Sequence, residues 1–444
     1  MCNNSGSRSI SVPRLNVQQL GIPKYFGRER KFISMNLLNL KDNPFLIRPS
    51  RPRVFVARGG GPYSNTRAAL GGIDLSSLRG KRVLLKPNAG RIASPGSGII
   101  TDPRVVAAAI DVLKEGGAEV AVGESPIVGV RALDAFDAIG ITRIAEERGC
   151  RIIDLDARPP VEVPVPEGLA IDSIRLCADV LEYDFIVSIP VMKTHMHTGV
   201  TLAVKNMKGC LWGRSKVALH MLPPVEGSSE RSINIAIADL SGVLRPHLAI
   251  IDGTVGMEGM GPSAGEPREL GVIVVSADCF AADAVACGLM GTRAEDVPYL
   301  RIGAERGYGV IDLDRIEVTP ENWRDWIVPF SPPPANLSIE FSGINILDKN
   351  SCSACQSTLF LFLKRYGDSI LDYFPDGASV NFAIGKGHPD VPAGTVCVGN
   401  CMARHQNRGI FIPGCPPVGS EILHGITGEP SIDRKDGHIE GNKS

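Results

Sequence analysis

The strongest constraint on the fold is an alternation, from about residue 52 to residue 291, of short β-branched runs with segments of helical periodicity. The runs are nearly continuous in apolar residues, which is typical of strands buried on both faces. The strand-like runs are 54–58, 82–88, 118–124, 151–155, 184–190, 247–253 and 271–277. The helical segments are 102–117, 233–244 and 280–291. This order predicts an α/β fold with a mainly parallel sheet and helices on both faces.

Shifts in composition divide the rest of the chain. Residues 1–50 lack sustained periodicity, so we expect them to form an N-terminal arm. The proline-rich stretch at 328–338 is typical of a linker. We therefore expect a large α/β domain over 51–330 and a smaller α/β, cysteine-rich domain over 336–430. The charged tail at 431–444 is expected to lie outside both domains.

Charge and hydropathy argue against two classes of partner. The 47 lysine and arginine residues are balanced by 48 aspartate and glutamate residues, without the basic excess typical of nucleic-acid binding. The longest apolar stretch, 271–291, contains Asp278 and Asp283, which are costly inside lipid. The N-terminal segment contains no apolar run long enough for a signal peptide. We therefore expect a cytoplasmic protein that binds neither nucleic acid nor a membrane.

Five of the eleven cysteines fall within residues 352–415, whereas the others are scattered. An odd total in a chain with no secretion signal argues against a disulfide framework and points to a metal site. The five are Cys352, Cys355, Cys397, Cys401 and Cys415. All but Cys397 lie at a predicted strand end or helix start, where free N–H groups favour anionic thiolates. An iron–sulfur cluster held by these four thiolates fits that setting, with Cys397 as an alternate ligand or a thiol that points elsewhere.

Two other interpretations of the cysteines stay open. Zinc takes four cysteines, or three together with His405, but structural zinc sites usually combine two closely spaced pairs. Here only Cys352 and Cys355 have that spacing. A redox dithiol at the same two residues would suit a helix start, yet it would leave the other thiols unexplained.

Polar side chains recur at the carboxyl ends of the predicted strands, where open parallel sheets bind ligands. The candidates are Lys86, Asn88, Glu124, Lys193, His195, Lys205, Asn206, Lys208, Asp252 and Glu258. Several lysines and carboxylates that converge on one edge suit an anionic small molecule, and we expect Lys86, Lys193 and Lys205 to clamp it. The plainer interpretation is that these lysines are solvated loop residues.

The catalytic roles fall to one histidine and two carboxylates. We expect His195 to act as the acid or base, and Asp252 with Glu258 to orient it or to hold a cation. His195 and His197 form an H-x-H pair that would suit a metal if Asp252 or His220 joined them. Two separate histidines, one hydrogen-bonded and one at the surface, are the plainer interpretation.

The glycine-rich segment 253–267 is expected to form a wide loop that shapes the pocket and carries Glu258. It contains neither the G-x-x-x-x-G-K-[ST] nor the G-x-G-x-x-G pattern of nucleotide-binding loops. The chain also lacks the G-x-S-x-G elbow of serine hydrolases. Nucleotide binding through these motifs and serine hydrolase chemistry therefore have no support.

A succession of motifs is similar to one known family. The motifs are KPN at 86–88, TDP at 101–103, GESP at 123–126, IPVMKTHMHTGVTLAVKNMKG at 189–209 and IIDGTVGMEGMGPSAGEPREL at 250–270. Over about residues 52–310 they resemble the uncharacterised family called domain of unknown function 362. Its members are often joined to iron–sulfur modules, which implies a [4Fe–4S] cluster on Cys352, Cys355, Cys401 and Cys415. The repeated C-x-x-C-x-x-C insert of ferredoxins is absent, which weakens a purely electron-carrying role.

Together, the residues and the resemblance predict an iron–sulfur enzyme. It would act on an anionic small molecule bound between the large domain and the cluster. Redox, Lewis-acid or sulfur-transfer chemistry would make it an oxidoreductase, a lyase or a sulfurtransferase. One alternative is a non-catalytic electron-transfer or cluster-sensing subunit with a redox partner protein. A second alternative is a zinc-stabilised binding protein.

Overall fold

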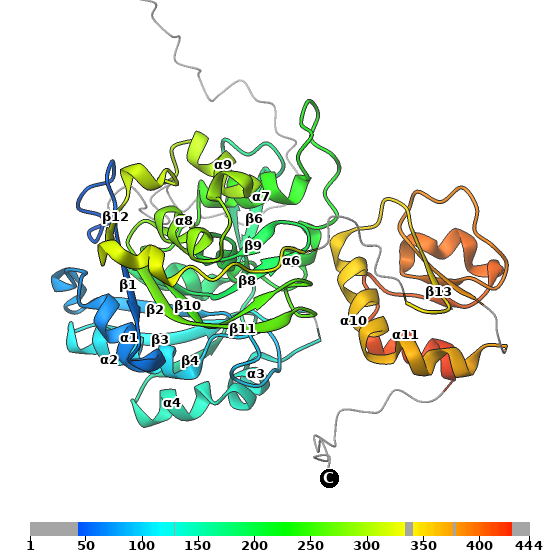
Figure 1. Ribbon diagram of the computed structural model, residues 1–444, viewed down its shortest axis with the longest axis horizontal. Helices are drawn as coiled ribbons and strands as arrows, with labels where there is room; N and C mark the ends of the chain where they lie inside the picture. Colours follow the sequence, from blue (N-terminus) through cyan, green and yellow to red (C-terminus); the bar gives the residue numbers. More distant parts are fainter. Residues whose placement is uncertain (1–42, 128, 334–340, 376–378, 429–444) are drawn as a thin grey trace, which may run out of the picture. The chain divides into compact units, whose positions relative to one another are not determined.

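A mixed sheet organises most of the chain (Figure 1). The computed structural model describes residues 43–127, 129–333, 341–375 and 379–428. In spatial order the strands are β12 (Glu317–Thr319), β1 (Arg53–Arg58), β11 (Glu266–Ser276), β10 (Leu248–Glu258), β7 (Phe185–Ile189), β2 (Arg82–Pro87), β3 (Glu119–Glu124) and β4 (Arg151–Asp154). Neighbours are parallel except that β11 is antiparallel to β1 and to β10. The predicted α/β fold with a mainly parallel sheet is confirmed.

Helices cover both faces of this sheet, also as predicted (Figure 1). One face carries α1 (Gly61–Leu70), α2 (Pro103–Glu115), α3 (Ala132–Ile139) and α4 (Ile141–Glu147). The other carries α7 (Ser232–Ser241), α8 (Cys279–Leu289) and α9 (Pro298–Glu305). Successive strand residues point to opposite faces. In β10, Ile250 therefore packs in the core that contains α2, whereas Ile251 packs in the core that contains α8.

Local capping signals explain why the helix starts are predictable. The Asp102 side chain accepts a hydrogen bond from the Arg104 N–H at 2.8 Å, and Pro103 occupies the first helical position of α2. The Asp278 carboxylate accepts from the Phe280 N–H at 2.9 Å at the start of α8. Both helices begin within one residue of the predicted start.

The prediction of a wide loop over 253–267 is wrong at both ends, and only residues 259–265 connect the two strands. β10 extends to Glu258 and β11 begins at Glu266, so these residues face each other in a long antiparallel hairpin with an irregularity after Gly253. Glycine at position 265 allows close backbone contact next to the hairpin, because a Cβ there would lie 2.1 Å from the Glu258 carbonyl oxygen. Glu258 therefore ends a strand.

Shorter elements between β7 and α7 carry most of the candidate site. Strand β8 (Val191–His195) runs parallel to β10, and β9 (Gly199–Thr201) pairs antiparallel with β8. They lead into α5 (Ala203–Asn206), a 3-10 turn (Met207–Cys210) and α6 (Ser215–Ala218). A separate two-stranded sheet consists of β5 (Val161–Pro164) and β6 (Ser173–Leu176).

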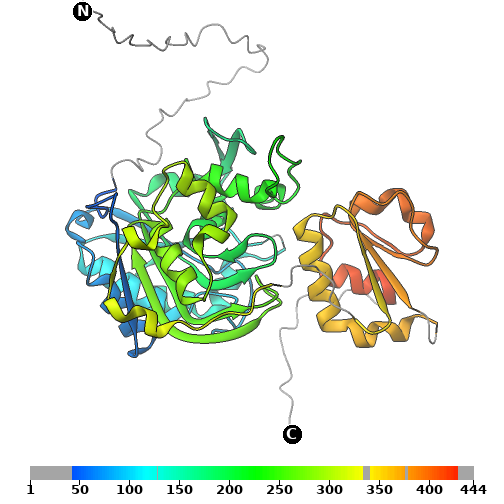
Figure 2. The same ribbon diagram turned by 45° about the horizontal axis from the view of Figure 1, so that its top comes forward.

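The C-terminal unit has a four-stranded parallel sheet of its own (Figure 2). Its strands, in order, are β13 (Ile344–Asp348), β14 (Val380–Ile384), β15 (Val396–Val398) and β16 (Phe411–Ile412), and its helices are α10 (Ser353–Ile370) and α11 (Gly419–Thr427). Phe362 of α10 and Ile422 of α11 pack on Phe382 of β14 in one core. This unit lies within the predicted 336–430 domain.

The ends of the chain lie partly outside the described residues. Of the predicted arm, residues 1–42 are outside, and so is the whole tail at 431–444. The part of the chain that the structure describes contains no helix long and apolar enough to cross a membrane.

Candidate functional site

Lys86, at the end of β2, forms a buried ion pair with Glu124, at the end of β3. The Lys86 Nζ lies 2.7 Å from Glu124 Oε2 and also donates to the Pro87 carbonyl and to Asn206 Oδ1. Glu124 accepts further bonds from the backbone N–H groups of Ala89 and Ser125, at 3.0 Å each. The pair is fully hydrogen-bonded, and the charge of Lys86 is already compensated.

Gly209 lies directly against this ion pair. A Cβ at that position would approach Lys86 Cε to 2.3 Å and Glu124 Oε1 to 2.7 Å. The VKNMKG motif therefore needs glycine at this point, so that the backbone of the 3-10 turn can close over the ion pair.

Lys193 is buried in β8 and bonds to neutral acceptors. Its Nζ donates to Asn88 Oδ1 at 3.1 Å and to the Ile99 carbonyl at 2.8 Å. Burial, followed by the charges of Arg91 and Lys86, lowers the pKa of Lys193 to about 7. Near neutral pH this amine is therefore present in both protonation states.

Lys205 is buried on α5 among other bases. Its Nζ donates to Thr201 Oγ1 at 3.0 Å. Burial, followed by the charges of Lys208 and Lys193, holds the pKa of Lys205 well below its usual value. Burial also lowers the pKa of Lys208 to about 7, with a contribution from Lys216.

Two histidines complete this group. The pKa of His195 is held well below its usual value by burial and then by Lys205. Its Nδ1 accepts the His197 backbone N–H at 3.1 Å. His220 contacts the amine of Lys208 through its Nε2, and burial and Lys208 lower its pKa as well. We call Lys193, His195, Lys205, Lys208 and His220 the basic cluster.

The two histidine side chains of the H-x-H motif bond to different groups. His195 ends β8, while His197 lies beyond the strand and its Nδ1 is 2.7 Å from an Arg231 guanidinium nitrogen. The two rings approach edge to face, with centroids 5.8 Å apart. A guanidinium against the imidazole adds another positive charge beside the basic cluster rather than a metal ligand.

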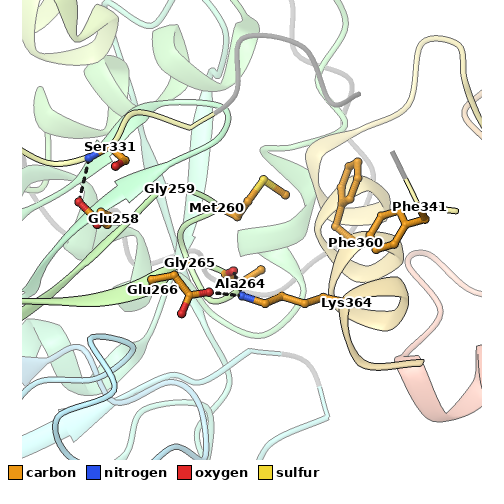
Figure 3. A pocket seen from close by; sticks show the side chains of 10 residues that line it. All are labelled: Glu258, Gly259, Met260, Ala264, Gly265, Glu266, Ser331, Phe341, Phe360 and Lys364. Atoms are coloured by element: carbon orange, nitrogen blue, oxygen red, sulfur yellow. Dashed lines mark hydrogen bonds and ion pairs between the residues drawn. The ribbon is translucent and has the colours of Figure 1, made fainter. Parts of the chain in front are cut away.

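Asp252 and Glu258 bond to groups other than His195. The Asp252 carboxylate accepts the backbone N–H of Asp102 at 2.7 Å and that of Thr254 at 2.9 Å, and burial raises its pKa to about 6. It thus ties β10 to the start of α2. Glu258 accepts the backbone N–H of Ser331 at 2.9 Å (Figure 3). Both carboxylates thus accept hydrogen bonds from backbone N–H groups, and not from His195, which they were expected to orient.

Two further residues near the site, Lys216 and Asp156, are not among the candidates from the sequence patterns. Lys216 is buried, contacts Ser125 Oγ and lies 3.6 Å from Asp156. Asp156 also accepts the Ser125 hydroxyl at 2.6 Å and the Gly213 N–H at 2.7 Å. Asp156 directly follows the predicted strand at 151–155, so the strand-end signal could have selected it, whereas Lys216 lies in a segment without periodicity and carries no such signal.

In the C-terminal unit, four of the five clustered cysteines influence one another. Cys352 precedes α10, and its pKa is lowered to about 6, first by a hydrogen bond from the Cys355 thiol and then by backbone N–H groups. The pKa of Cys355 is raised by Cys352, by burial and by the charges of Cys401 and Cys415. The pKa of Cys401 is raised by burial, Cys352 and Cys415. The backbone agrees with these effects. The Asn400 N–H donates to the Gly414 carbonyl at 2.8 Å, which brings Cys401 and Cys415 together, and a Cβ on Gly399 would lie 3.2 Å from Cys355 Sγ.

Cys397 belongs to a different environment. It is fully buried in a small separate core with Ala383, Val391 and Met402, and its Sγ lies 3.7 Å from the His405 carbonyl. His405 itself bonds through Nε2 to Arg404 and to the His388 carbonyl.

In the part of the chain that the structure describes, no three histidine, cysteine, aspartate or glutamate side chains are arranged to hold a metal ion. In an iron–sulfur cluster, each thiolate binds a different iron atom. The four sulfurs of such a site are therefore farther apart than the ligands of a single ion.

A family model and a protein sequence match this chain. The family described as "Domain of unknown function (DUF362)" matches residues 83–288, a span that contains the basic cluster and ends before the clustered cysteines. A thylakoid-associated protein of Synechocystis sp. is 32% identical over 239 residues, which are 52% of this chain and 69% of that protein.

Two solved structures are similar at low identity. A crystal structure of a Thermotoga maritima protein is 16% identical and covers 52% of this chain and 60% of its own, with a TM-score of 0.32. The lactate racemase apoprotein of Thermoanaerobacterium thermosaccharolyticum is 11% identical and covers 87% of this chain and 82% of its own, with a TM-score of 0.38.

Proposed function

Because the chain belongs to the DUF362 family, whose description names no activity, we propose a function from the chain's own residues: it is an enzyme that binds a small anion at the basic cluster. The observation that carries this proposal is a group of buried bases bonded to neutral partners. Lys193 bonds to an amide and a carbonyl oxygen, and Lys205 bonds to a hydroxyl. Buried bases that depress one another's pKa are stabilised when an anion supplies the missing charge.

The same groups are suited to proton transfer. A base works best when its pKa lies near the working pH, and the pKa of Lys193 is about 7. Neutral His195 accepts a hydrogen bond at Nδ1, which places its own proton on Nε2. Lys193, protonated when the anion is bound, would therefore donate a proton to the bound molecule, and His195 Nε2–H would donate a hydrogen bond to it.

We propose a second function, the binding of a cofactor, for the C-terminal unit. The cofactor would be a [4Fe–4S] cluster held by Cys352, Cys355, Cys401 and Cys415. The supporting observation is that the backbone bond from Asn400 to Gly414 brings Cys401 and Cys415 together and that Gly399 lies against Cys355 Sγ, whereas Cys397 lies in a different core. The pKa of Cys355 also responds to Cys352, Cys401 and Cys415. The start of α10 supplies N–H groups that favour thiolate at Cys352. When bound, such a cluster supplies electron transfer or Lewis-acid chemistry.

A binding experiment tests the anion site. Inorganic phosphate, citrate and acetate are titrated by calorimetry into the full chain and into Lys193→Ala. We expect at least one anion to bind wild type and to bind Lys193→Ala about tenfold or more weakly, the loss of one charge-assisted hydrogen bond.

The exposed Lys81 provides the matched control, and Lys81→Ala should bind as wild type does. Absorption near 400 nm in protein purified without oxygen should be the same in all three proteins. Equal affinity in Lys193→Ala and wild type would contradict the anion site. Loss of the absorption in Lys193→Ala would contradict the separation of the two functions.

A further inference from the structure

The bases of the cluster follow one another through strand register and hydrogen bonds. Lys193 on β8 lies opposite Thr201 on β9, and the Thr201 hydroxyl accepts the bond from Lys205 at 3.0 Å. Lys205 acts on His195 and His220, and is itself acted on by both Lys193 and Lys208. Lys208 lies three residues after Lys205, in the 3-10 turn that follows α5, so Lys205 lies between Lys193 on β8 and the contacting pair of Lys208 and His220. A ligand that reaches both ends of this series passes Lys205.

The nearby carboxylates do not balance these charges. Glu124 lies beside Lys193, but it is already paired with Lys86 at 2.7 Å. Asp156 is 3.6 Å from Lys216, the residue that acts on Lys208. Arg91 and the Arg231–His197 pair add positive charge around the cluster. One negative charge on a ligand would compensate one of these bases and leave the rest as they are.

We infer that the ligand carries at least two negative charges, as a phosphate ester or a di- or tricarboxylate does, and that Lys205 contacts it between two anionic groups. The inference rests on the anion-binding function proposed above. A monocarboxylate has charge for only one part of the series. A dianion or trianion can meet Lys193 and the Lys208–His220 pair together, with charge-assisted hydrogen bonds to each.

Binding of such a ligand requires the bases to take up protons. The groups that face Lys205 are Lys193, His195, Lys208 and His220, all of them bases whose charge is suppressed by burial and by one another. A multiply charged anion restores the charged form, so protons are taken from the buffer. Acetate should drive less uptake.

The test is calorimetry at pH 8 in two buffers of different ionisation enthalpy, which measures affinity and proton uptake together. Inorganic phosphate, citrate and acetate are titrated into the full chain. We expect phosphate or citrate to bind about tenfold or more tightly than acetate and to take up one or more protons. Tighter phosphate would indicate a phosphate ester, and tighter citrate a polycarboxylate.

Two variants and a control locate the effect. Lys205→Met should weaken phosphate or citrate binding about tenfold or more and reduce the proton uptake, whereas Lys81→Met should change neither. Lys208→Met, at a partly exposed position, provides the same readout if Lys205→Met does not fold. Acetate that binds as tightly as phosphate and citrate, in a Lys205-dependent way, would overturn the inference and keep the proposed function. If none of the three anions binds, the proposed function itself is wrong.

Discussion

At the scale of single residues, burial among like charges governs the chemistry of the basic cluster. Lys86 on β2 and Lys193 on β8 are both buried, yet Lys86 has Glu124 as a partner at 2.7 Å, whereas Lys193 bonds to an amide and a carbonyl. An ion pair keeps a buried amine charged, and neutral acceptors do so less well. Lys86 therefore contributes structure, and Lys193 retains a proton that can move.

The lowered pKa of Lys193 makes the stability of the ligand-free protein depend on pH. Between about 7 in the folded chain and roughly 10.4 in the unfolded chain, the unfolded chain holds a proton that the folded chain lacks. The contribution of Lys193 to the unfolding free energy therefore rises with pH above 7. Between pH 7 and pH 8.5, the unfolding free energy of Lys193→Met should rise by about 1–2 kcal/mol less than that of wild type.

Urea unfolding of both proteins at the two pH values provides this measurement, and the comparison cancels any constant effect of the substitution on packing. Lys81→Met should retain the wild-type dependence, because Lys81 is exposed. The same pH dependence in Lys193→Met and wild type would mean that Lys193 is charged in the folded protein throughout this range.

Some contacts of the site follow from local sequence and others do not. The alternation around Cys397 predicts that this thiol can point away from the other four, and it packs in a separate core. The bond from the Asp102 N–H to Asp252 joins positions 150 residues apart, so no spacing could reveal it. For the same reason, the pairing of Lys86 with Glu124 was not predictable from either strand.

At the scale of secondary-structure elements, α2 connects local capping to the site. Asp102 caps α2 through its side chain, while its own N–H bonds to Asp252 on β10. The strands and helices of the large sheet were predictable because apolar periodicity and caps agree there. The β10–β11 hairpin was not, because its glycines suggest a loop although their role is close approach of the two strands.

The cap on α2 can be tested by substitution. Asp102→Ala removes the acceptor of the Arg104 N–H and should lower the unfolding free energy by about 1 kcal/mol. Asp102→Asn keeps an oxygen at the capping position, so we expect most of the stability to remain. Urea unfolding of the two variants distinguishes the cases. An equal loss in both would assign the effect to the negative charge, which pairs with Arg104, instead of the cap.

At the scale of the whole molecule, two sheets carry two different kinds of chemistry. The basic cluster belongs to the part of the chain built on the large mixed sheet. Cys352, Cys355, Cys401 and Cys415 belong to the C-terminal unit with its four-stranded parallel sheet. The family match over 83–288 contains the basic cluster and ends before the clustered cysteines. The proposed [4Fe–4S] cluster would therefore be a cofactor of the C-terminal unit, separate from the anion site.

The most direct test of this claim is the content of iron, zinc and acid-labile sulfide per chain in protein purified without oxygen. We expect about four irons and four sulfides, with broad absorption near 400 nm. Cys401→Ser should lose most of this signal, whereas Cys397→Ser should keep it because Cys397 lies in a separate core. One zinc and no sulfide per chain would contradict the cluster and leave the basic cluster as the site of any chemistry.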